Sequence, residues 1–376
     1  MKKSLIIFLI LSSLICFKSY SKTKLDFLFI YYMPYDNNLS KYGESIIEQI
    51  QSGTNKKIGA VIQADFADTL GLKRYSIYNK KIKSFNLNTE TTDKQVYKDY
   101  FLWINENFEV ENYCIVFLNH GGDLIEFGLD RYPNTSYSDI MDIKETVEYF
   151  NSIQKNKAKL LFLQQCARGS IESIYEFKNC ADYTLFSQTE LGAPNSYYKE
   201  TEQGLNSNIL MSGKDLAELI VKNDGSRMYN SYTLINNSKI DSFVSELKNY
   251  FNSFNDSIYI DYDKLLTINY NGESYWDLKS LVSIINCKDS LSAKYKTIVL
   301  KNLNNNEIII HYKNPKIEFI QEYCGISFFS PHNENISSSK YKRLKLFKTI
   351  DYNQLRESTN KKIVKENIII EDLIFR

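Results

Sequence analysis

The sequence has no excess of charge of either sign. It holds 46 basic and 45 acidic residues among 376, which gives a formal net charge of +1. This balance excludes the electrostatic bias with which proteins attract nucleic acid or anionic lipid, so we expect no nucleic-acid partner. The content of 43% hydrophobic and 14% aromatic residues excludes extensive disorder and indicates a globular chain with a sizeable core.

Long hydrophobic runs are also missing after the N-terminus. No later segment approaches the roughly 20 apolar residues that a membrane-spanning helix needs, so we expect no stable membrane span. At the N-terminus, Met1-Lys2-Lys3 is followed by an apolar stretch over residues 5–17 and then by Lys18-Ser19-Tyr20-Ser21. This order is typical of a secretory signal peptide over residues 1–21, and it predicts a protein that is periplasmic, at the cell surface or secreted.

Two alternatives to a cleaved signal peptide remain open. An uncleaved anchor fits less well because the apolar stretch is shorter than a membrane-spanning helix. A lipid anchor at Cys16 is the less favoured interpretation, because bulky Ile15 stands where lipoprotein processing needs a small residue.

Cysteine and histidine are scarce. Five of the six cysteines follow residue 21, and an odd number in an exported protein suggests a free thiol. The three histidines do not form the paired spacing with cysteine that zinc sites use, so the pattern predicts no metal. His311 lies in an alternating strand pattern and His332 in a Pro-Asn loop, so both are expected to be surface or structural residues. His120 is therefore the candidate functional histidine.

The order of apolar segments predicts an α/β fold. Strands are expected at residues 25–33, 58–64, 72–78, 82–87, 112–119, 159–165, 183–187, 308–312 and 325–330. Helices are expected near 39–50, 93–107, 143–154, 209–221, 240–254 and 276–285. This alternation predicts a mainly parallel central sheet flanked by helices, with a helix-rich C-terminal part. A boundary near residue 200 divides a catalytic core at 22–200 from a C-terminal part at 201–376 that completes the domain.

Two of the expected strands end in residues that carry chemistry. One apolar run leads directly into Cys166, and another ends at His120. The carboxyl ends of parallel strands gather at one edge of a sheet, so the thiol and the imidazole can meet there. Cys166 is the candidate nucleophile and His120 the candidate general base and acid. A helix expected to begin near Ser170 would direct its positive dipole end toward the thiol.

The glycines beside the histidine complete a candidate site for acyl transfer. The tetrahedral intermediate of such a reaction needs N–H donors for its oxyanion. Gly121 and Gly122 allow close backbone approach, and the backbone N–H groups of Gly121 and Cys166 are the predicted donors. The structural alternative is that the cysteine is a small core residue and the glycine pair a tight turn.

These motifs resemble known cysteine peptidases. The run from Gln164 through Gly169 is similar to the caspase signature around its nucleophile. The whole chain is closer to the clostripain-like (C11) family of the caspase-like clan CD. Its anchors are Tyr32-Met33, Asp36-Asn37-Asn38-Leu39, Asn119-His120-Gly121-Gly122, Cys166 with Gly169-Ser170, Glu172 and Tyr175-Glu176, and residues 325–331. The resemblance implies a caspase-like fold and an endopeptidase that cuts polypeptides through a Cys166–His120 dyad and an acyl-enzyme.

One departure from the family concerns substrate choice. Family members that cut after arginine or lysine resemble one another in an acid two residues before the cysteine, where this chain has Gln164. A neutral amide cannot offset a buried guanidinium, so the basic preference is not carried over. Gln164 and Glu190 are the predicted substrate-binding residues, with Glu190 as a substitute acidic wall.

Calcium is possible by family resemblance only. The sequence itself requires no cofactor, because it contains no dense Asp/Asn calcium loop. Nothing in the sequence demands an oligomer, and a monomer is the simplest expectation.

Supporting residues and rival functions also remain open. Asp36 and Asn37 are typical of an Asx turn, with a supporting role near the site as the second interpretation. Arg168 either lines the substrate cleft or, more commonly for arginine, is solvated or ion-paired.

The rival functions are a catalytically inactive caspase-like scaffold that binds a peptide or surface partner, and a transpeptidase or amidase with the same dyad.

Overall fold

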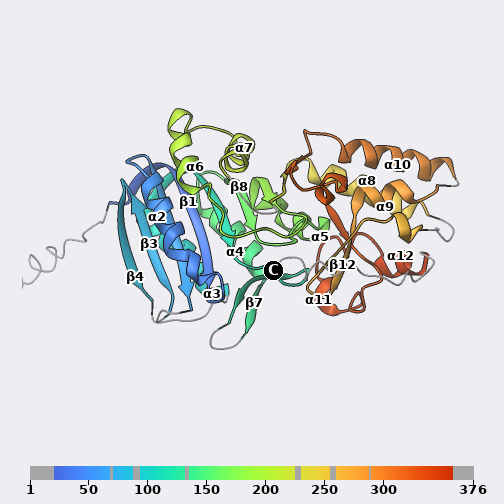
Figure 1. Ribbon diagram of the computed structural model, residues 1–376, viewed down its shortest axis with the longest axis horizontal. Helices are drawn as coiled ribbons and strands as arrows, with labels where there is room; N and C mark the ends of the chain where they lie inside the picture. The colour runs from blue at the N-terminus through green and yellow to red at the C-terminus, as the bar shows by residue number, and fades with distance from the viewer. Residues whose placement is uncertain are drawn as a thin grey trace, which may run out of the picture.

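A nine-stranded, mainly parallel sheet forms the centre of the molecule in the computed structural model (Figure 1). The structure describes residues 21–67, 71–87, 94–131, 135–224, 230–254, 260–287 and 289–358. The expected signal peptide at 1–21, with Cys16, lies outside these residues except for its last position. In spatial order the strands are β13 (Ile309–Tyr312), β10 (Tyr232–Asn236), β9 (Ala181–Phe186), β8 (Ala158–Gln164), β5 (Phe108–Leu118), β1 (Thr23–Tyr35), β2 (Ile58–Phe66), β3 (Lys73–Tyr78) and β4 (Lys81–Asn86).

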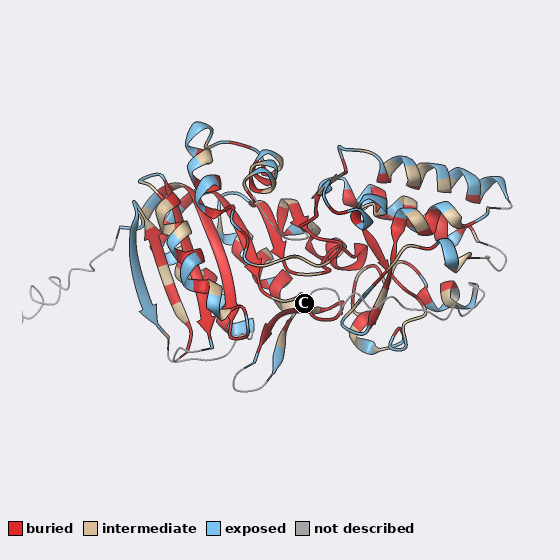
Figure 2. Cartoon of the chain, in the orientation of Figure 1, coloured by how far each residue is buried: buried red, intermediate tan, exposed pale blue. Residues whose placement is uncertain are grey.

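The five inner strands from β9 to β2 run parallel, and the antiparallel strands lie at the two edges. The inner strands are near-continuous apolar runs because both of their faces are covered. Along β1, Phe27 and Phe29 face one buried cluster and Leu28 and Ile30 face the other, as the two-residue period of a strand requires. The edge strand β4 is exposed along its whole length (Figure 2).

Helices cover both faces of this sheet. One cluster of buried hydrophobic residues packs one face of the sheet against α2 (Gly43–Gly53), α6 (Tyr198–Gly204) and α7 (Gly213–Asn223). The other cluster joins the opposite face to α3 (Lys94–Asn107), α4 (Ile140–Ile153) and α5 (Ile171–Glu176). These buried layers confirm the predicted α/β class, and they fix the strand ends from which the candidate site residues emerge.

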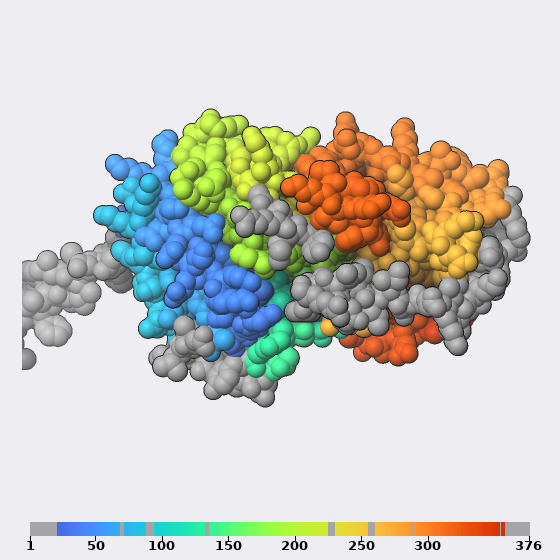
Figure 3. Space-filling model, viewed as in Figure 1, coloured from blue at the N-terminus to red at the C-terminus, as the bar shows by residue number. Residues whose placement is uncertain are grey.

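Most of the chain from residue 240 onward forms a second mass at one end of an elongated molecule (Figure 3). A small antiparallel sheet, in the order β11 (Thr267–Tyr270), β12 (Glu273–Asp277) and β14 (Ser327–Phe329), lies there. It is accompanied by α8 (Ile240–Asn252), α9 (Leu278–Ile284), α10 (Ser290–Leu303), α11 (Ser339–Lys342) and α12 (Tyr352–Ser358). Short 3-10 helices occur at Ser40–Tyr42, Phe177–Asn179, Leu205–Ser207, Tyr262–Lys264 and Phe319–Glu322.

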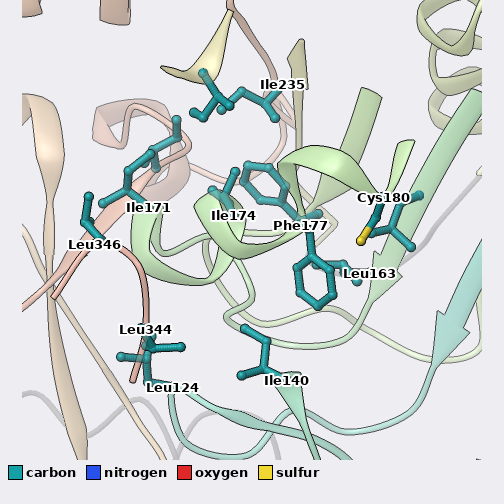
Figure 4. Packing of buried hydrophobic residues seen from close by; sticks show 14 of the residues in the cluster. Leu124, Ile140, Leu163, Ile171, Ile174, Phe177, Cys180, Ile235, Leu344 and Leu346 are labelled. Carbon is teal, nitrogen blue, oxygen red and sulfur yellow. The ribbon is translucent and has the colours of Figure 1, made fainter. Parts of the chain in front are cut away.

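Helix α5 joins the two masses. Ile171 and Ile174 of this helix belong to the buried cluster that also contains Leu344 and Leu346 from the C-terminal part (Figure 4). Residue 200, where the sequence suggests a boundary, lies within α6, and both β10 and β13 of the later part add to the large sheet. Within the described residues, no helix combines the length and apolarity needed to cross a bilayer.

Several segments differ from the sequence-based expectation. The helix expected at 276–285 begins at Leu278, because Trp276 pairs with Phe328 in the small sheet. The expected long loop after His120 contains a hairpin of β6 (Glu126–Asp130) and β7 (Ser136–Asp139). Strand β10 and helix α10 were not expected, since β10 is only five residues long and α10 has only three fully buried residues.

Candidate active site

The candidate nucleophile and base follow neighbouring parallel strands at the same level. Leu118 at the end of β5 pairs with Gln164 at the end of β8. His120 and Cys166 each come two residues later. Because neighbouring strands lie about 4.8 Å apart, the two residues follow adjoining strand ends at the same edge of the sheet. The described contacts include no hydrogen bond between them, and each side chain bonds to a different partner.

The loop that carries His120 (the histidine loop) and the loop that carries Cys166 (the nucleophile loop) are in direct contact. A methyl group added at Gly121 would collide with the backbone carbonyl of Cys166, so only glycine allows this approach. Ala167, directly after the cysteine, has a φ of 52°, in the left-handed region. The sharp turn after β8 therefore brings the nucleophile loop against the histidine loop.

Arg168 ties these two loops together. The side chain is only 1% exposed, so it neither lines an open cleft nor is solvated, and its role differs from both interpretations of the sequence. Its guanidinium donates hydrogen bonds of 2.6–3.0 Å to the backbone carbonyls of Cys166, Gly122, Asp123 and Glu126. A planar group with five N–H donors suits such a set of acceptors.

The Cys166 thiol is half-buried and contacts the backbone of Leu191. The Leu191 N–H donates to the sulfur at 3.3 Å, and the thiol lies 3.6 Å from the Leu191 carbonyl. Burial raises the pKa of Cys166 above its ordinary value; the Leu191 backbone, Tyr270 and Arg168 act in the opposite direction, and the charge of Glu190 adds to the rise. The resting state is therefore a neutral thiol.

The helix α5 expected after the cysteine is present. Ser170 caps it, accepting a hydrogen bond from the Ser173 N–H at 3.3 Å. The helix contains only six residues and begins five residues after Cys166. Its dipole is correspondingly small, since the effect falls off within the first turn.

His120 is held by Asn38 through one nitrogen of its ring. The imidazole Nε2 lies 2.7 Å from Asn38 Oδ1. An amide oxygen only accepts, so Nε2 carries the proton and Nδ1 is left as the basic nitrogen. Burial, together with the positive charge of Arg131, lowers the pKa of His120 below 6.5. The imidazole is therefore neutral near pH 7, as a general base must be.

A second layer of asparagines fixes the histidine loop. Asn119 Oδ1 accepts the His120 N–H at 2.5 Å and the Asn37 amide at 3.0 Å. Asn37 also accepts the Leu39 N–H at 2.9 Å, which is the Asx turn expected from the sequence. Asn37 thus has both proposed roles, because it closes the turn and supports the loop that carries the imidazole.

Gln164 is buried in a polar network under the sheet edge. Its amide donates to Asn195 Oδ1 at 2.7 Å and to the Tyr198 hydroxyl at 3.0 Å, and its oxygen accepts from the Tyr197 hydroxyl at 2.6 Å. Asn195 in turn donates to Asp224, an acid that the sequence analysis did not select. The side-chain amide of Gln164 is therefore already hydrogen-bonded within the protein, whereas Glu190 is close enough for its charge to act on the Cys166 thiol.

Tyr270 is a further residue at the thiol that the sequence analysis missed. Its hydroxyl donates to the Gly121 carbonyl at 3.1 Å, and it is also a hydrogen-bonding neighbour of the Cys166 sulfur. It lies at the tip of the β11–β12 hairpin, next to Asn271-Gly272. An Asn-Gly pair between alternating apolar residues is a strong hairpin signal, and it could have revealed this element.

The other two histidines have structural partners. His311 Nε2 lies 2.6 Å from Ser231 Oγ, and His332 Nε2 lies 3.0 Å from the Tyr262 hydroxyl. The residues that the structure describes contain no group of three or more His, Cys, Asp or Glu arranged to hold a metal ion.

These features define an α/β protein with a thiol and an imidazole at adjacent carboxyl ends of a parallel sheet. The sequence profile of the clostripain family, peptidase family C11, matches residues 31–366. The chain therefore belongs to the clostripain family and is a cysteine-type peptidase, as its motifs predicted. No curated protein matches the sequence.

Solved structures of C11 proteases share this fold. A secreted C11 cysteine protease from Bacteroides thetaiotaomicron, in complex with an irreversible peptide inhibitor, is 18% identical with a TM-score of 0.64, covering 88% of this chain and 99% of its own. An inactive zymogen C11 protease from Parabacteroides distasonis is 14% identical with a TM-score of 0.61, covering 88% and 98%. At these identities the similarity shows the fold, and it confirms the expected caspase-like α/β arrangement.

Proposed function

We propose that this protein is an exported cysteine endopeptidase in which Cys166 is the nucleophile and His120 the general base and acid. The observation that supports it best is the equal register of the two residues beyond Leu118 and Gln164 on paired parallel strands. His120 Nδ1 takes the thiol proton as the sulfur attacks a peptide carbonyl. The imidazolium then gives that proton to the leaving amine, and water hydrolyses the thioester.

The oxyanion donors are the backbone N–H groups of Gly121 and Cys166. Within the described part of the chain, neither group donates to a protein acceptor, so both remain available to a ligand. They belong to the two loops that Arg168 ties together. Two fixed donors on either side of the scissile carbonyl would stabilise the oxyanion without reorganisation, and losing one such donor typically costs about 10²–10³ in rate.

Substrate selection involves Gln164 and Glu190 in different ways. Gln164 acts indirectly, by holding Asn195, Tyr197 and Tyr198, to which its amide group is already bonded. Glu190 supplies the acidic side, and its influence on the Cys166 thiol supports this placement. The proposed substrate is a polypeptide, in keeping with the peptide inhibitor bound to the Bacteroides thetaiotaomicron protease.

Export is supported by the order of charged, apolar and small residues over 1–21 and by the similarity to a secreted C11 protease. Calcium has less support. The described residues offer no cluster of carboxylates for it, and calcium takes six to eight oxygen ligands. The proposed steps use only Cys166, His120 and backbone donors, and a calcium dependence stays a prediction from family resemblance.

The assignment is tested by replacing the thiol. Cys166→Ala should abolish both labelling by a thiol-directed peptide probe and cleavage of a diverse peptide library. Cys287→Ala is the matched control, since Cys287 is another half-buried free cysteine, and it should retain both activities. Cleavage that survives in Cys166→Ala would contradict the proposal. Labelling of the wild type without turnover would favour the peptide-binding scaffold, and capture of the acyl group by added amines would favour a transpeptidase.

A further inference from the structure

The tip of the β11–β12 hairpin is held at one position by its own turn. Tyr270 pairs with Glu273, and only Asn271 and Gly272 lie between them, with φ angles of 49° and 76°. Two successive residues in the left-handed region form the tight hairpin turn that matches strand twist. The turn therefore fixes the direction in which the Tyr270 side chain leaves the hairpin.

Glu273 fastens this tip to the histidine loop. Its buried carboxylate accepts hydrogen bonds from the Leu124 N–H at 2.7 Å and the Tyr275 hydroxyl at 2.5 Å, and also from the Tyr341 hydroxyl. Leu124 follows His120 by only four residues. The hairpin is thus anchored by a main-chain donor from the same loop that carries the base.

The nucleophile loop is fastened to the same small sheet. The Ser327 N–H in β14 donates to the Gly169 carbonyl at 2.8 Å, and β14 pairs with β12. Gly169 follows Cys166 by three residues. The hairpin is therefore connected to both loops of the site, which is the property of a fixed component and not of a lid.

The Tyr270 hydroxyl has one proton and two possible acceptors. In the resting state it donates to the Gly121 carbonyl at 3.1 Å, with the Cys166 thiol as its second neighbour. A hydroxyl hydrogen rotates about its C–O bond to suit its surroundings. When the sulfur ionises, it becomes the stronger acceptor, because hydrogen bonds to charged groups exceed neutral ones. Burial raises the pKa of Tyr270, so the hydroxyl keeps its proton.

We propose that Tyr270 is a third catalytic residue, which turns its hydroxyl from the Gly121 carbonyl to the Cys166 sulfur and stabilises the thiolate before attack. This inference rests on the proposed function of Cys166. Once the sulfur–carbon bond forms, the charge leaves the sulfur and the hydroxyl returns to Gly121. The proton that leaves the thiol goes to His120 throughout, and Tyr270 neither gains nor loses one.

The charged groups that face this hydroxyl and thiol are Arg168 and Glu190. They act in opposite directions on the thiol, because the positive charge favours the thiolate and the negative charge opposes it. Besides the Leu191 N–H, the Tyr270 hydroxyl is thus the neutral hydrogen-bond donor next to the Cys166 sulfur.

The test is Tyr270→Phe, which removes the hydroxyl and keeps the ring. The rate of alkylation of Cys166 by iodoacetamide is measured against pH, with the site read from the Cys166 peptide by mass spectrometry. Losing a hydrogen bond to the thiolate should raise the pH midpoint of alkylation by about one pH unit and lower peptide cleavage near pH 7 about ten-fold. Tyr323→Phe is the matched control, since that hydroxyl bonds to the Thr267 carbonyl in the same small sheet.

Each outcome decides the inference. An unchanged alkylation curve in Tyr270→Phe would overturn it, and faster alkylation at every pH would show that Tyr270 obstructs the thiol instead. Equal thermal unfolding of Tyr270→Phe and the wild type would confirm that the change is local. The alkylation readout does not need turnover, so a shifted curve in a protein that cuts no peptide would support the role of Tyr270 while contradicting the peptidase proposal.

Discussion

The two regions that meet at Cys166 contribute to the site in different ways. The large sheet provides Cys166 and His120 from the ends of adjacent parallel strands, so their spacing follows from strand pairing. The small C-terminal sheet provides Tyr270 from a hairpin tip that is distant in sequence. The large sheet thus sets the positions of the proposed reacting pair, whereas the C-terminal part contributes to the surroundings of the sulfur.

The two regions are also stabilised differently at the site. The strands behind Cys166 and His120 are buried between two apolar layers. The hairpin that carries Tyr270 is attached through hydrogen bonds to one buried acid, Glu273, whose pKa is raised by burial. Substitutions in the sheet should therefore damage the reaction itself, and substitutions at the junction should alter stability and its dependence on pH.

The largest effect is expected at the base on the sheet side. His120→Ala leaves the thiol without a proton acceptor, and peptide cleavage should fall by about 10²–10⁴-fold, the usual contribution of general acid–base catalysis. Steady-state kinetics on a cleaved library peptide measures this loss. His332→Ala serves as a control because its partner is Tyr262 and it lies outside the proposed machinery. Equal rates for His120→Ala and the wild type would remove His120 from the mechanism.

The next effect is expected where the two loops are joined. Arg168→Ala would remove the guanidinium donor from four backbone carbonyls, of which those of Asp123 and Glu126 keep a main-chain donor, and the free energy of unfolding should fall by about 3–5 kcal/mol. Arg168→Lys keeps the charge without the planar fork, so it should fall between Arg168→Ala and the wild type. Urea denaturation followed by circular dichroism provides the values. A loss below about 1 kcal/mol for Arg168→Ala would show that the carbonyls find water instead.

The junction of α5 with the C-terminal part should respond to pH through Glu172. This buried carboxyl accepts the Phe329 N–H at 2.9 Å and the Tyr352 hydroxyl at 2.5 Å, and burial raises its pKa from 4.5 to about 7. The folded protein holds the proton more tightly than the unfolded chain. The resulting stabilisation is complete below pH 4.5 and is lost as the pH rises to about 7, by about 3 kcal/mol.

Glu172→Gln should remove that dependence, because a glutamine stays neutral. Denaturation at several pH values should show the wild type losing about 3 kcal/mol more than Glu172→Gln between pH 4.5 and about 7. Parallel curves for the two proteins would show that Glu172 does not titrate in this range.

The smallest effect is expected at Asn38, which orients the imidazole from an exposed position. Asn38→Ala should lower cleavage only about two- to ten-fold, since one neutral hydrogen bond is lost. The acid limb of the pH–rate profile reports the pKa of His120 and should lie below 6.5 in the wild type. Asn38→Asp places a carboxylate beside the ring, so it should move this limb to higher pH. A limb above 6.5 in the wild type would contradict the neutral resting imidazole.

Much of the fold was predictable because its signals are local. The inner strands are apolar runs next to helical patterns, so their places in the sequence and their mainly parallel direction could be inferred before the structure. The same signals located His120 and Cys166 at strand ends. The helical periodicity of residues 278–285 led to a predicted helix that wrongly included Trp276, because an aromatic residue fits either a buried helix or a buried strand. The Asn271-Gly272 turn was a local signal that was overlooked.

The contacts of individual polar residues were not predictable in the same way. Arg168 is buried because its carbonyl acceptors lie on another loop, and no pattern around Arg168 shows them. Gln164 stands where an acid is expected, by resemblance, in family members that cut after arginine or lysine, yet its partner Asn195 links it to Asp224, a residue far along the chain. Such networks depend on which backbone and side-chain groups are left unsatisfied after the sheet has formed.

The amino-acid pattern by itself determined the parallel sheet, the strand ends that carry the thiol and the imidazole, and the family to which the chain belongs. It could do so because apolar periodicity and short motifs act over a few neighbouring residues. Only the tertiary structure decided that Arg168 joins the two loops, that Asn38 selects the histidine tautomer and that Tyr270 reaches the sulfur. Those outcomes require groups from distant segments to meet, which local sequence does not encode.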